Sequence, residues 1–337
     1  MSTRDYLIDT AIRHQVFTER YIAGQARTAD RIMADMAREI GLAITGREID
    51  VATMDEVREI LRDHYSQVAD HVVDGAGEFI VSEGDFVHEV YSRTTDEELN
   101  QPEEADLQRL VAEGTITTSA GGVFVIRSMM KQFAQRKTEQ ILGLITDGAA
   151  TGLTSQEIAS SIYTMQRTLH RRQVAALVST ITNHLAAKAR ERFFTINTKV
   201  TDRYEWVSTL DSRTTFVCMS RDGEVYRHGE GPLPPAHWAC RSTIIGRIKP
   251  KFDLGLDIKS TRPAVNEDGA SRVSGKTTYA GWLKTQSKEF IDEALGVERS
   301  KLFRSGKIKL DKFVDPTGRV YTLDELAGQR PIELAGL

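Results

Sequence analysis

Both cysteines of this chain, Cys218 and Cys240, lie in one stretch, residues 206–248. The same stretch holds His237, an Asp-Gly pair and two consecutive prolines, so it combines residue types of metal or nucleophile sites with those of tight turns. Outside it, apolar residues recur mainly at every third or fourth position, which is the period of an amphipathic helix. The chain is therefore expected to be an α+β protein, with helices arranged around one small module of mixed structure.

The length of 337 residues predicts roughly two or three domains. Apolar residues make up 40% of the chain, enough for hydrophobic cores, and the net charge of −4 argues against a protein that coats nucleic acid. No run of about 18 apolar residues occurs, so we predict no membrane contact. Residues 1–9 lack the apolar core of a secretory signal, and two cysteines are too few for a disulfide scaffold. Both features indicate synthesis in a reducing cytoplasm.

Residues 1–150 are predicted to form a helical N-terminal region. The apolar periodicity predicts helices over 6–44, from 53 to a break at Gly75 and Gly77, over 82–91, and over 123–144 after the pair Gly121-Gly122. Between them, residues 94–113 contain seven acidic residues and one arginine. This composition predicts a solvated acidic connection, with a docking surface for a basic partner as the alternative.

Residues 151–250 are predicted to be helices leading into the α+β module. Thr154 and Glu157 have the spacing of a capping box, which predicts a helix start. Residues 171–194 carry one apolar stripe with basic residues near both ends, typical of a core helix with solvated ends. For the helix that starts at Thr154, the alternative is the first helix of a helix-turn-helix. For residues 171–194, the alternative is a contact of the basic residues with an acidic partner or a phosphate backbone. Downstream we predict a strand near 204–207, an Asp222-Gly223 hairpin between 216–218 and 224–226, and a strand at 242–246.

Within the module, His237 and Cys240 are three residues apart, and Cys218 is the natural third member of a cluster. The favoured interpretation is structural: the two thiols are buried, His237 bonds a backbone carbonyl, and Arg241 anchors an internal carboxylate. Zinc binding is an alternative, in which the fourth ligand is uncertain among Asp211, Asp222 and His228. A nucleophilic cysteine with His237 as base and Asp211 as orienting group is another. A Cys218–Cys240 disulfide is also compatible with the spacing. We predict no catalytic residue and no bound metal.

The order of these residues resembles a known family. Leu210-Asp211-Ser-Arg213-Thr, then Cys218, Asp222-Gly223 and Pro234-Pro235-Ala-His237-Trp-Ala-Cys240-Arg241 is similar to the signature of Mu F-like phage minor head proteins, also called head morphogenesis proteins. Many relatives carry further cysteines where this chain has Met219, Ser220 and Ser242. The resemblance identifies Asp211, Arg213, Cys218, His237, Cys240 and Arg241 as a structural motif.

Residues 251–337 are predicted to be a linker followed by a helical tail. Residues 262–275 are polar and rich in Gly and Ser, which predicts the linker. A helix is expected from Tyr279 to Leu295, ended by Gly296, and a short one at 323–326. The segment 278–326 also resembles the tail of the same family. Six basic residues between them are candidate contacts with DNA or the portal: Arg299, Lys301, Arg304, Lys307, Lys309 and Lys312.

The resemblance implies a structural protein of the virion that lies inside the capsid near the portal. Its expected partners are the portal protein, capsid or scaffolding proteins and the packaged DNA, and its expected role is head assembly or the passage of DNA during genome ejection. The alternative function is a hydrolase or toxin-like enzyme that uses Cys218, His237 and Asp211. A third hypothesis is a nucleic-acid-binding module that uses the basic residues of 299–312.

Overall fold

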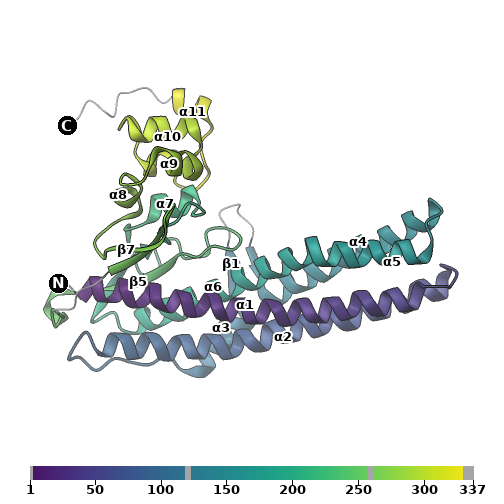
Figure 1. Cartoon of the computed structure of the whole chain (residues 1–337). Helices are drawn as coiled ribbons and strands as arrows, with labels where there is room; N and C mark the ends of the chain where they lie inside the picture. The colour runs from purple at the N-terminus through teal and green to yellow at the C-terminus, as the bar shows by residue number, and fades with distance from the viewer. Residues whose placement is uncertain (1–2, 118–122, 257–260, 329–337) are drawn as a thin grey trace.

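The computed structural model describes residues 3–117, 123–256 and 261–328. Its largest elements are two helices of 42 residues each, α1 (Thr3–Ile44) and α2 (Val51–Ser92), joined by a short loop and running side by side in opposite directions (Figure 1). Asp50 caps α2 by accepting a hydrogen bond from the backbone N–H of Thr53, 2.8 Å away. These two helices form the long axis of the molecule.

Helix α2 runs without interruption through Gly75 and Gly77, so the predicted break there was wrong. A Cβ atom on Gly75 would lie 2.9 Å from the hydroxyl of Tyr21, and one on Gly77 would lie 3.0 Å from the amide of Gln108. The Tyr21 hydroxyl also donates a hydrogen bond to the Gly75 carbonyl at 2.6 Å. The two glycines therefore allow α1 and the segment containing Gln108 to approach α2 closely.

Five further helical segments complete the bundle: α3 (Glu104–Glu113), α4 (Ile126–Ala150), α5 (Ser155–Met165), the π-helical turn η1 (Gln166–His170) and α6 (Arg171–Ile196). The predicted capping box is confirmed, since the Thr154 hydroxyl and the Glu157 carboxylate each bond the other residue's backbone N–H. The helix predicted from Val123 begins three residues later, because β2 (Val123–Val125) pairs with β1 (Thr115–Thr117). The pair Gly121-Gly122 lies outside the described residues.

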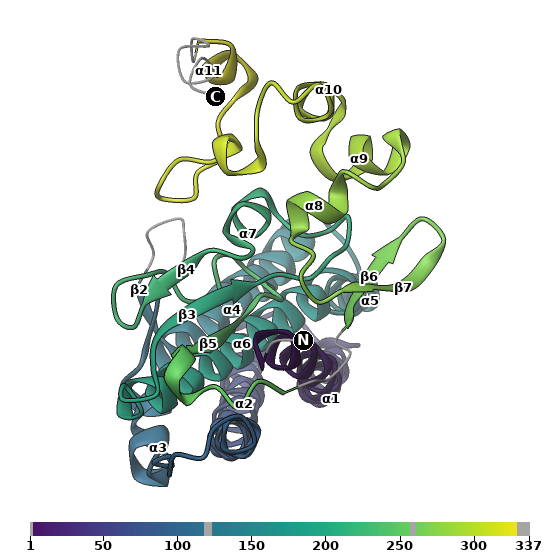
Figure 2. The same cartoon turned by 90° about the vertical axis from the view of Figure 1, so that its left-hand side faces the viewer.

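The central module contains a three-stranded antiparallel sheet in the order β4-β3-β5, formed by β3 (Thr201–Val207), β4 (Val225–Arg227) and β5 (Thr243–Ile248). The predicted hairpin was wrong in one arm, because residues 216–221 form helix α7 (Phe216–Arg221) and β4 pairs with β3 instead. Figure 2 shows this sheet beside α1 and α6 at one end of the bundle. A short turn, η2 (Pro250–Phe252), follows the sheet.

The predicted linker at 262–275 is also wrong, since β6 (Thr261–Asn266) and β7 (Gly269–Ser274) form an antiparallel hairpin. The predicted helix at 279–295 is divided into α8 (Tyr279–Leu283) and α9 (Lys288–Leu295), because Ser287 caps α9 by accepting from the Phe290 N–H. Three short helical segments follow: α10 (Val297–Arg304), η3 (Leu310–Phe313) and α11 (Leu323–Gly328).

Three hydrophobic cores hold these parts together. One runs along the bundle between α1, α2, α4, α5 and α6. Another lies mainly in the tail between Tyr279 and Leu326 and includes Leu210, Met219 and Ala264, which join the tail to the module. The third joins the sheet to the first turns of α1, the end of α2 and the end of α6, through residues such as Ile8, Tyr91 and Phe194. The predicted α+β class is confirmed. The module is built against the ends of the long helices, which position the site described next.

Candidate functional site

Cys218, His237 and Cys240 come together in the module and are called here the Cys-His-Cys cluster. The Sγ atom of Cys218 lies 3.3 Å from Nε2 of His237 and 3.6 Å from Sγ of Cys240, and all three donor atoms lie within 4.8 Å of one another. Both thiols are buried, and His237 is half-buried. The sequence spacing therefore predicted the members of the cluster correctly.

Cys218 is positioned by α7, which is tied to the end of β3 through Ser208. The Ser208 hydroxyl donates to the Cys218 carbonyl at 2.7 Å, and it accepts a hydrogen bond from the indole N–H of Trp206 at 2.9 Å. It also contacts the hydroxyl of Ser242, which precedes β5, at 3.2 Å. One buried hydroxyl thus links three segments that surround the cluster.

His237 and Cys240 are presented by a tight turn between β4 and β5. The Cys240 N–H donates to the His237 carbonyl at 3.2 Å, and Ala239 between them has a positive φ of 55°. The N–H of Ala239 donates to the hydroxyl of Thr180 on α6, 3.0 Å away. A non-glycine residue in this conformation is uncommon, so the contact from α6 stabilises a turn that would otherwise be unfavourable.

The three side chains of the cluster shift one another's pKa values. The hydrogen bond with Cys218, followed by that with His237, holds the pKa of Cys240 well below its usual value. Burial, followed by the neighbouring Cys240, raises the pKa of Cys218 well above its usual value. Burial lowers the pKa of His237, but its hydrogen bond with Cys240 outweighs burial and raises that pKa overall. Such a set of donors suits soft metal ions and thiol chemistry.

Asp211 does not orient His237, so the structure does not assemble the triad of the enzyme hypothesis. The Asp211 carboxylate accepts two hydrogen bonds from Arg241, at 2.5 and 2.9 Å, and it is 5% exposed. Burial raises the pKa of Asp211, but the Arg241 guanidinium outweighs burial and lowers it overall. Nδ1 of His237 instead lies 2.9 Å from the carbonyl of Trp238. These are the contacts that the structural interpretation expects.

The other residues considered as metal ligands are occupied elsewhere. Asp222 is buried and bound to Arg262 at 2.5 Å, and His228 is stacked on Phe194 with ring centres 5.5 Å apart. Within the described ranges, no fourth Cys, His, Asp or Glu joins the cluster. The side chain of Arg213 is 80% exposed and 4.0 Å from Asp211, so it belongs to the motif only through its backbone N–H, which donates to Asp211.

Two buried ion pairs near the module were not predicted. Glu83 on α2 accepts hydrogen bonds from Arg190 on α6 at 2.5 Å and contacts His14 on α1 at 2.7 Å. Arg262 on β6 binds both carboxylate oxygens of Asp222. The partners are far apart in the chain, so only one signal was available: Glu83 lies on the same apolar helix face as buried residues one turn away on each side.

The six basic residues of the tail have different surroundings. Arg299 is half-buried, donates to the Tyr321 carbonyl at 2.8 Å and lies over the ring of Phe216, so it is part of the tail's own structure. Lys301 forms an ion pair with Glu298 at 2.6 Å. The other four side chains are exposed: Arg304, Lys307, Lys309 and Lys312.

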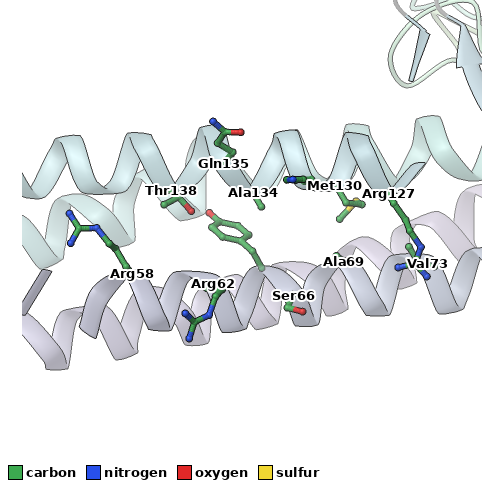
Figure 3. Close-up of a pocket in the computed structure, with 12 residues that line it drawn as sticks. Arg58, Arg62, Ser66, Ala69, Val73, Arg127, Met130, Ala134, Gln135 and Thr138 are labelled. Atoms are coloured by element: carbon green, nitrogen blue, oxygen red, sulfur yellow. The ribbon is translucent and has the colours of Figure 1, made fainter. Parts of the chain in front are cut away.

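A groove between α2 and α4, called here the α2–α4 groove, lies along the bundle between the start of α4 and the first half of α2 (Figures 1 and 3). Its volume is about 460 Å³. The floor is mainly apolar and the rim is basic, with Arg58 and Arg62 on α2 and Arg127 and Lys131 on α4. The groove could not be predicted from local sequence patterns, because its two sides come from segments more than fifty positions apart.

The fold and the site define a class: an α+β protein in which a long helical bundle supports a small sheet and a buried Cys-His-Cys cluster. Residues 139–245 match the family described as Phage Mu protein F like protein, so this region of the chain is Mu F-like and the predicted resemblance is confirmed over these residues. The match runs from α4 into β5 and includes the whole cluster. It supports a phage protein of the head-morphogenesis type. The likeness of the tail lies outside the match and stays a prediction.

No curated protein and no solved structure matches the chain. Among the helices of the described residues, none is both long and apolar enough to cross a membrane.

Proposed function

We propose that this protein is a non-enzymatic minor head protein of a phage, bound inside the capsid near the portal, where it aids head assembly or the passage of DNA. The observation that carries this proposal is the Mu F-like match over residues 139–245, which coincides with the part of the fold that holds the Cys-His-Cys cluster. The proposal concerns a scaffold, in which the cluster maintains the shape of the module.

The surroundings of the cluster support a structural role. Cys240 is 0% exposed and Cys218 is 1% exposed, so neither sulfur is accessible to a substrate of ordinary size. The carboxylate that an enzyme would need to orient His237 is held by Arg241 instead. A Cys-His hydrolase remains the alternative hypothesis: Cys218 contacts His237, but both sulfurs are buried and the orienting carboxylate is bound to Arg241.

The tail supports a contact with an acidic surface or with DNA. Arg304, Lys307, Lys309 and Lys312 are exposed on one short segment of chain, and cations so arranged bind phosphates or carboxylates by charge. We propose that this segment contacts the portal protein or the packaged DNA. Contacts with phosphates would weaken steeply as the salt concentration rises.

The test is quantitative mass spectrometry of purified virions, combined with capture of the portal protein by the purified chain. We expect the protein in DNA-filled heads at few copies, and we expect it to retain the portal protein. Absence from finished particles would overturn the proposal. A variant with Lys307→Glu and Lys309→Glu should lose retention of the portal or of DNA, whereas the matched change Lys276→Glu, outside this segment, should not.

A further inference from the structure

We propose that the Cys-His-Cys cluster is a zinc site, in which Cys218, His237 and Cys240 supply three ligands and a water molecule supplies the fourth. This inference does not rest on the proposed function, since three protein donors can hold a zinc ion whatever the role of the module. It goes beyond the sequence-based prediction, which included no metal because the fourth ligand was uncertain. The geometry of the three donors is what supports it.

Two of the three distances within the cluster are close to the edges of a zinc tetrahedron. Zinc–sulfur bonds of about 2.3 Å and zinc–nitrogen bonds of about 2.0–2.1 Å place tetrahedral ligands roughly 3.5–3.8 Å apart. The observed separations are 3.6 Å between the two sulfurs and 3.3 Å between Cys218 Sγ and His237 Nε2. The third pair, Cys240 and His237, lies within 4.8 Å, so an ion would draw these two donors together around it.

The second ring nitrogen of His237 supports the same assignment. Nδ1 lies 2.9 Å from the Trp238 carbonyl, which can only accept, so Nδ1 carries the proton and donates. In the neutral ring this leaves the lone pair of Nε2 directed at the two sulfurs. Histidines that bind metals typically donate the other ring N–H to a backbone carbonyl or a carboxylate in this way.

The types of the three donors favour zinc as the bound ion, and the residues around them leave water as the fourth ligand. Two thiolates with one imidazole favour zinc over hard cations such as magnesium and calcium. The nearby carboxylates, Asp211 and Asp222, are held by Arg241 and Arg262 and are not available as a fourth ligand. His237 is half-buried and Trp238 beside it is exposed, so a water ligand would approach the ion from that side of the cluster.

The experiment is elemental analysis of the full chain, purified under reducing conditions with no histidine tag. We expect about one zinc ion per chain, and a cobalt-substituted sample should show a thiolate-to-cobalt charge-transfer band. The double variant Cys218→Ser/Cys240→Ser should lose both signals, whereas the control His228→Gln, a half-buried histidine outside the cluster, should retain them. A folded wild-type chain that is isolated without zinc and binds none on titration would overturn the proposal, even if the double variant fails to fold.

A second and independent observation concerns the α2–α4 groove. The geometry points to a docking site for an acidic amphipathic helix of another protein. Four of the twelve side chains that line the groove are cationic and none is acidic. Arg127 and Lys131 have no ion-pair partner among the described residues, whereas Arg58 and Arg62 pair with acidic residues of their own helix.

The floor of the groove indicates that apolar contacts, as well as charge, would contribute to binding the helix. Tyr65, Ala69, Val73, Met130 and Ala134 give it an apolar surface, which suits the apolar face of a helix lying in a groove. Tyr65 is 4% exposed, and its hydroxyl has no hydrogen-bond partner. An apolar floor suits DNA poorly, because phosphates would lie over it.

The test uses a synthetic helical peptide with leucines on one face and glutamates on its flanks, followed by fluorescence anisotropy. We expect saturable binding, weakened about tenfold or more by Arg127→Glu with Lys131→Glu. The control is Arg136→Glu, an exposed residue of α4 that does not line the groove, and it should leave binding unchanged. Equal binding of a scrambled peptide, or of a DNA duplex with the same dependence on these residues, would overturn the proposal.

Discussion

The helical bundle and the small module are stabilised by different means. The bundle core is formed by apolar side chains at helical spacing, such as Ile40, Leu61 and Ile145. The module has fewer apolar residues in its core, and its segments are joined by buried polar contacts such as Arg262–Asp222, Arg241–Asp211 and the bonds of Ser208. The bundle is thus held by non-directional contacts, and the module by contacts that depend on the position of single atoms.

This difference has a consequence for how each region tolerates change. A long apolar core loses stability in proportion to the side-chain volume removed, because neighbouring residues still contact one another. A buried ion pair behaves differently, because removing one partner leaves an uncompensated charge away from water. A small sheet that must hold three donors within a few ångströms therefore depends on a few residues far from the cluster in sequence.

The largest expected effect is the loss of the Arg262 guanidinium in the variant Arg262→Met. Arg262 is 3% exposed, and its removal leaves the buried Asp222 carboxylate without its partner. We expect the free energy of unfolding to fall by about 3–5 kcal/mol, measured by urea denaturation. Arg213→Met, whose side chain is mostly exposed, serves as the control and should change it by less than about 0.5 kcal/mol. A small effect of Arg262→Met would show that the hairpin β6–β7 is not anchored to the module.

A comparable test in the bundle is Leu61→Ala, which removes a fully buried side chain from the main core. We expect a loss of about 2–5 kcal/mol in the free energy of unfolding, since a cavity remains between α2 and its neighbours. The matched control is Leu42→Ala on α1, where the side chain is 80% exposed and the loss should be within about 0.5 kcal/mol. If both variants lost the same amount, the bundle would not be stabilised as described.

Acid should weaken the bundle through buried neutral histidines. Burial, followed by Lys188, lowers the pKa of His184 to about 3, and burial, followed by Lys137, lowers that of His170 to about 4. Below pH 6.5 the unfolded chain therefore binds protons that the folded chain does not, so the free energy of unfolding falls as pH falls toward these values. Each histidine should contribute about 1.4 kcal/mol per pH unit in that window.

Urea denaturation between pH 7 and pH 5 measures this slope. The variant His184→Gln should reduce the slope relative to the wild type. The carboxylate of Asp211 acts in a lower range, because its pKa is lowered by Arg241 and its contribution is lost only below the usual range of an aspartate. An identical slope in wild type and His184→Gln would contradict the assignment.

The smallest expected effect is at the capping box of α5. Thr154→Ala removes the hydroxyl that accepts from the Glu157 N–H and should cost about 1 kcal/mol. Thermal unfolding followed by circular dichroism would measure it, and Thr164→Ala, an exposed position of the same helix, is the control. An unchanged melting temperature would show that the end of the bundle at α5 unfolds separately from the rest.

Local patterns predicted much of the helical part, because the buried face of a helix is visible as a period of apolar residues within its own sequence. The boundaries of α1 and α6, the capping box and the members of the Cys-His-Cys cluster follow from spacing along the chain. Two errors share one cause. Gly75 and Gly77 look like a break and the Asp222-Gly223 turn looks like a hairpin in isolation, yet both are decided by contacts with other segments of the chain. The segment 262–275 is different, because β6 and β7 pair locally and their polar composition was mistaken for that of a linker.

The amino-acid sequence alone thus determined the helices, the composition of the cluster and the family of its central region, since these depend on residue type and spacing within one stretch. Only the tertiary structure decided that the Asp211 carboxylate pairs with Arg241 and not with His237, and that Asp222 pairs with Arg262. The same holds for the groove with a basic rim between α2 and α4. The physical reason is that a charge or a soft donor can be satisfied by several partners of the same chemical type. Which partner it meets depends on how the long helices bring separate segments together.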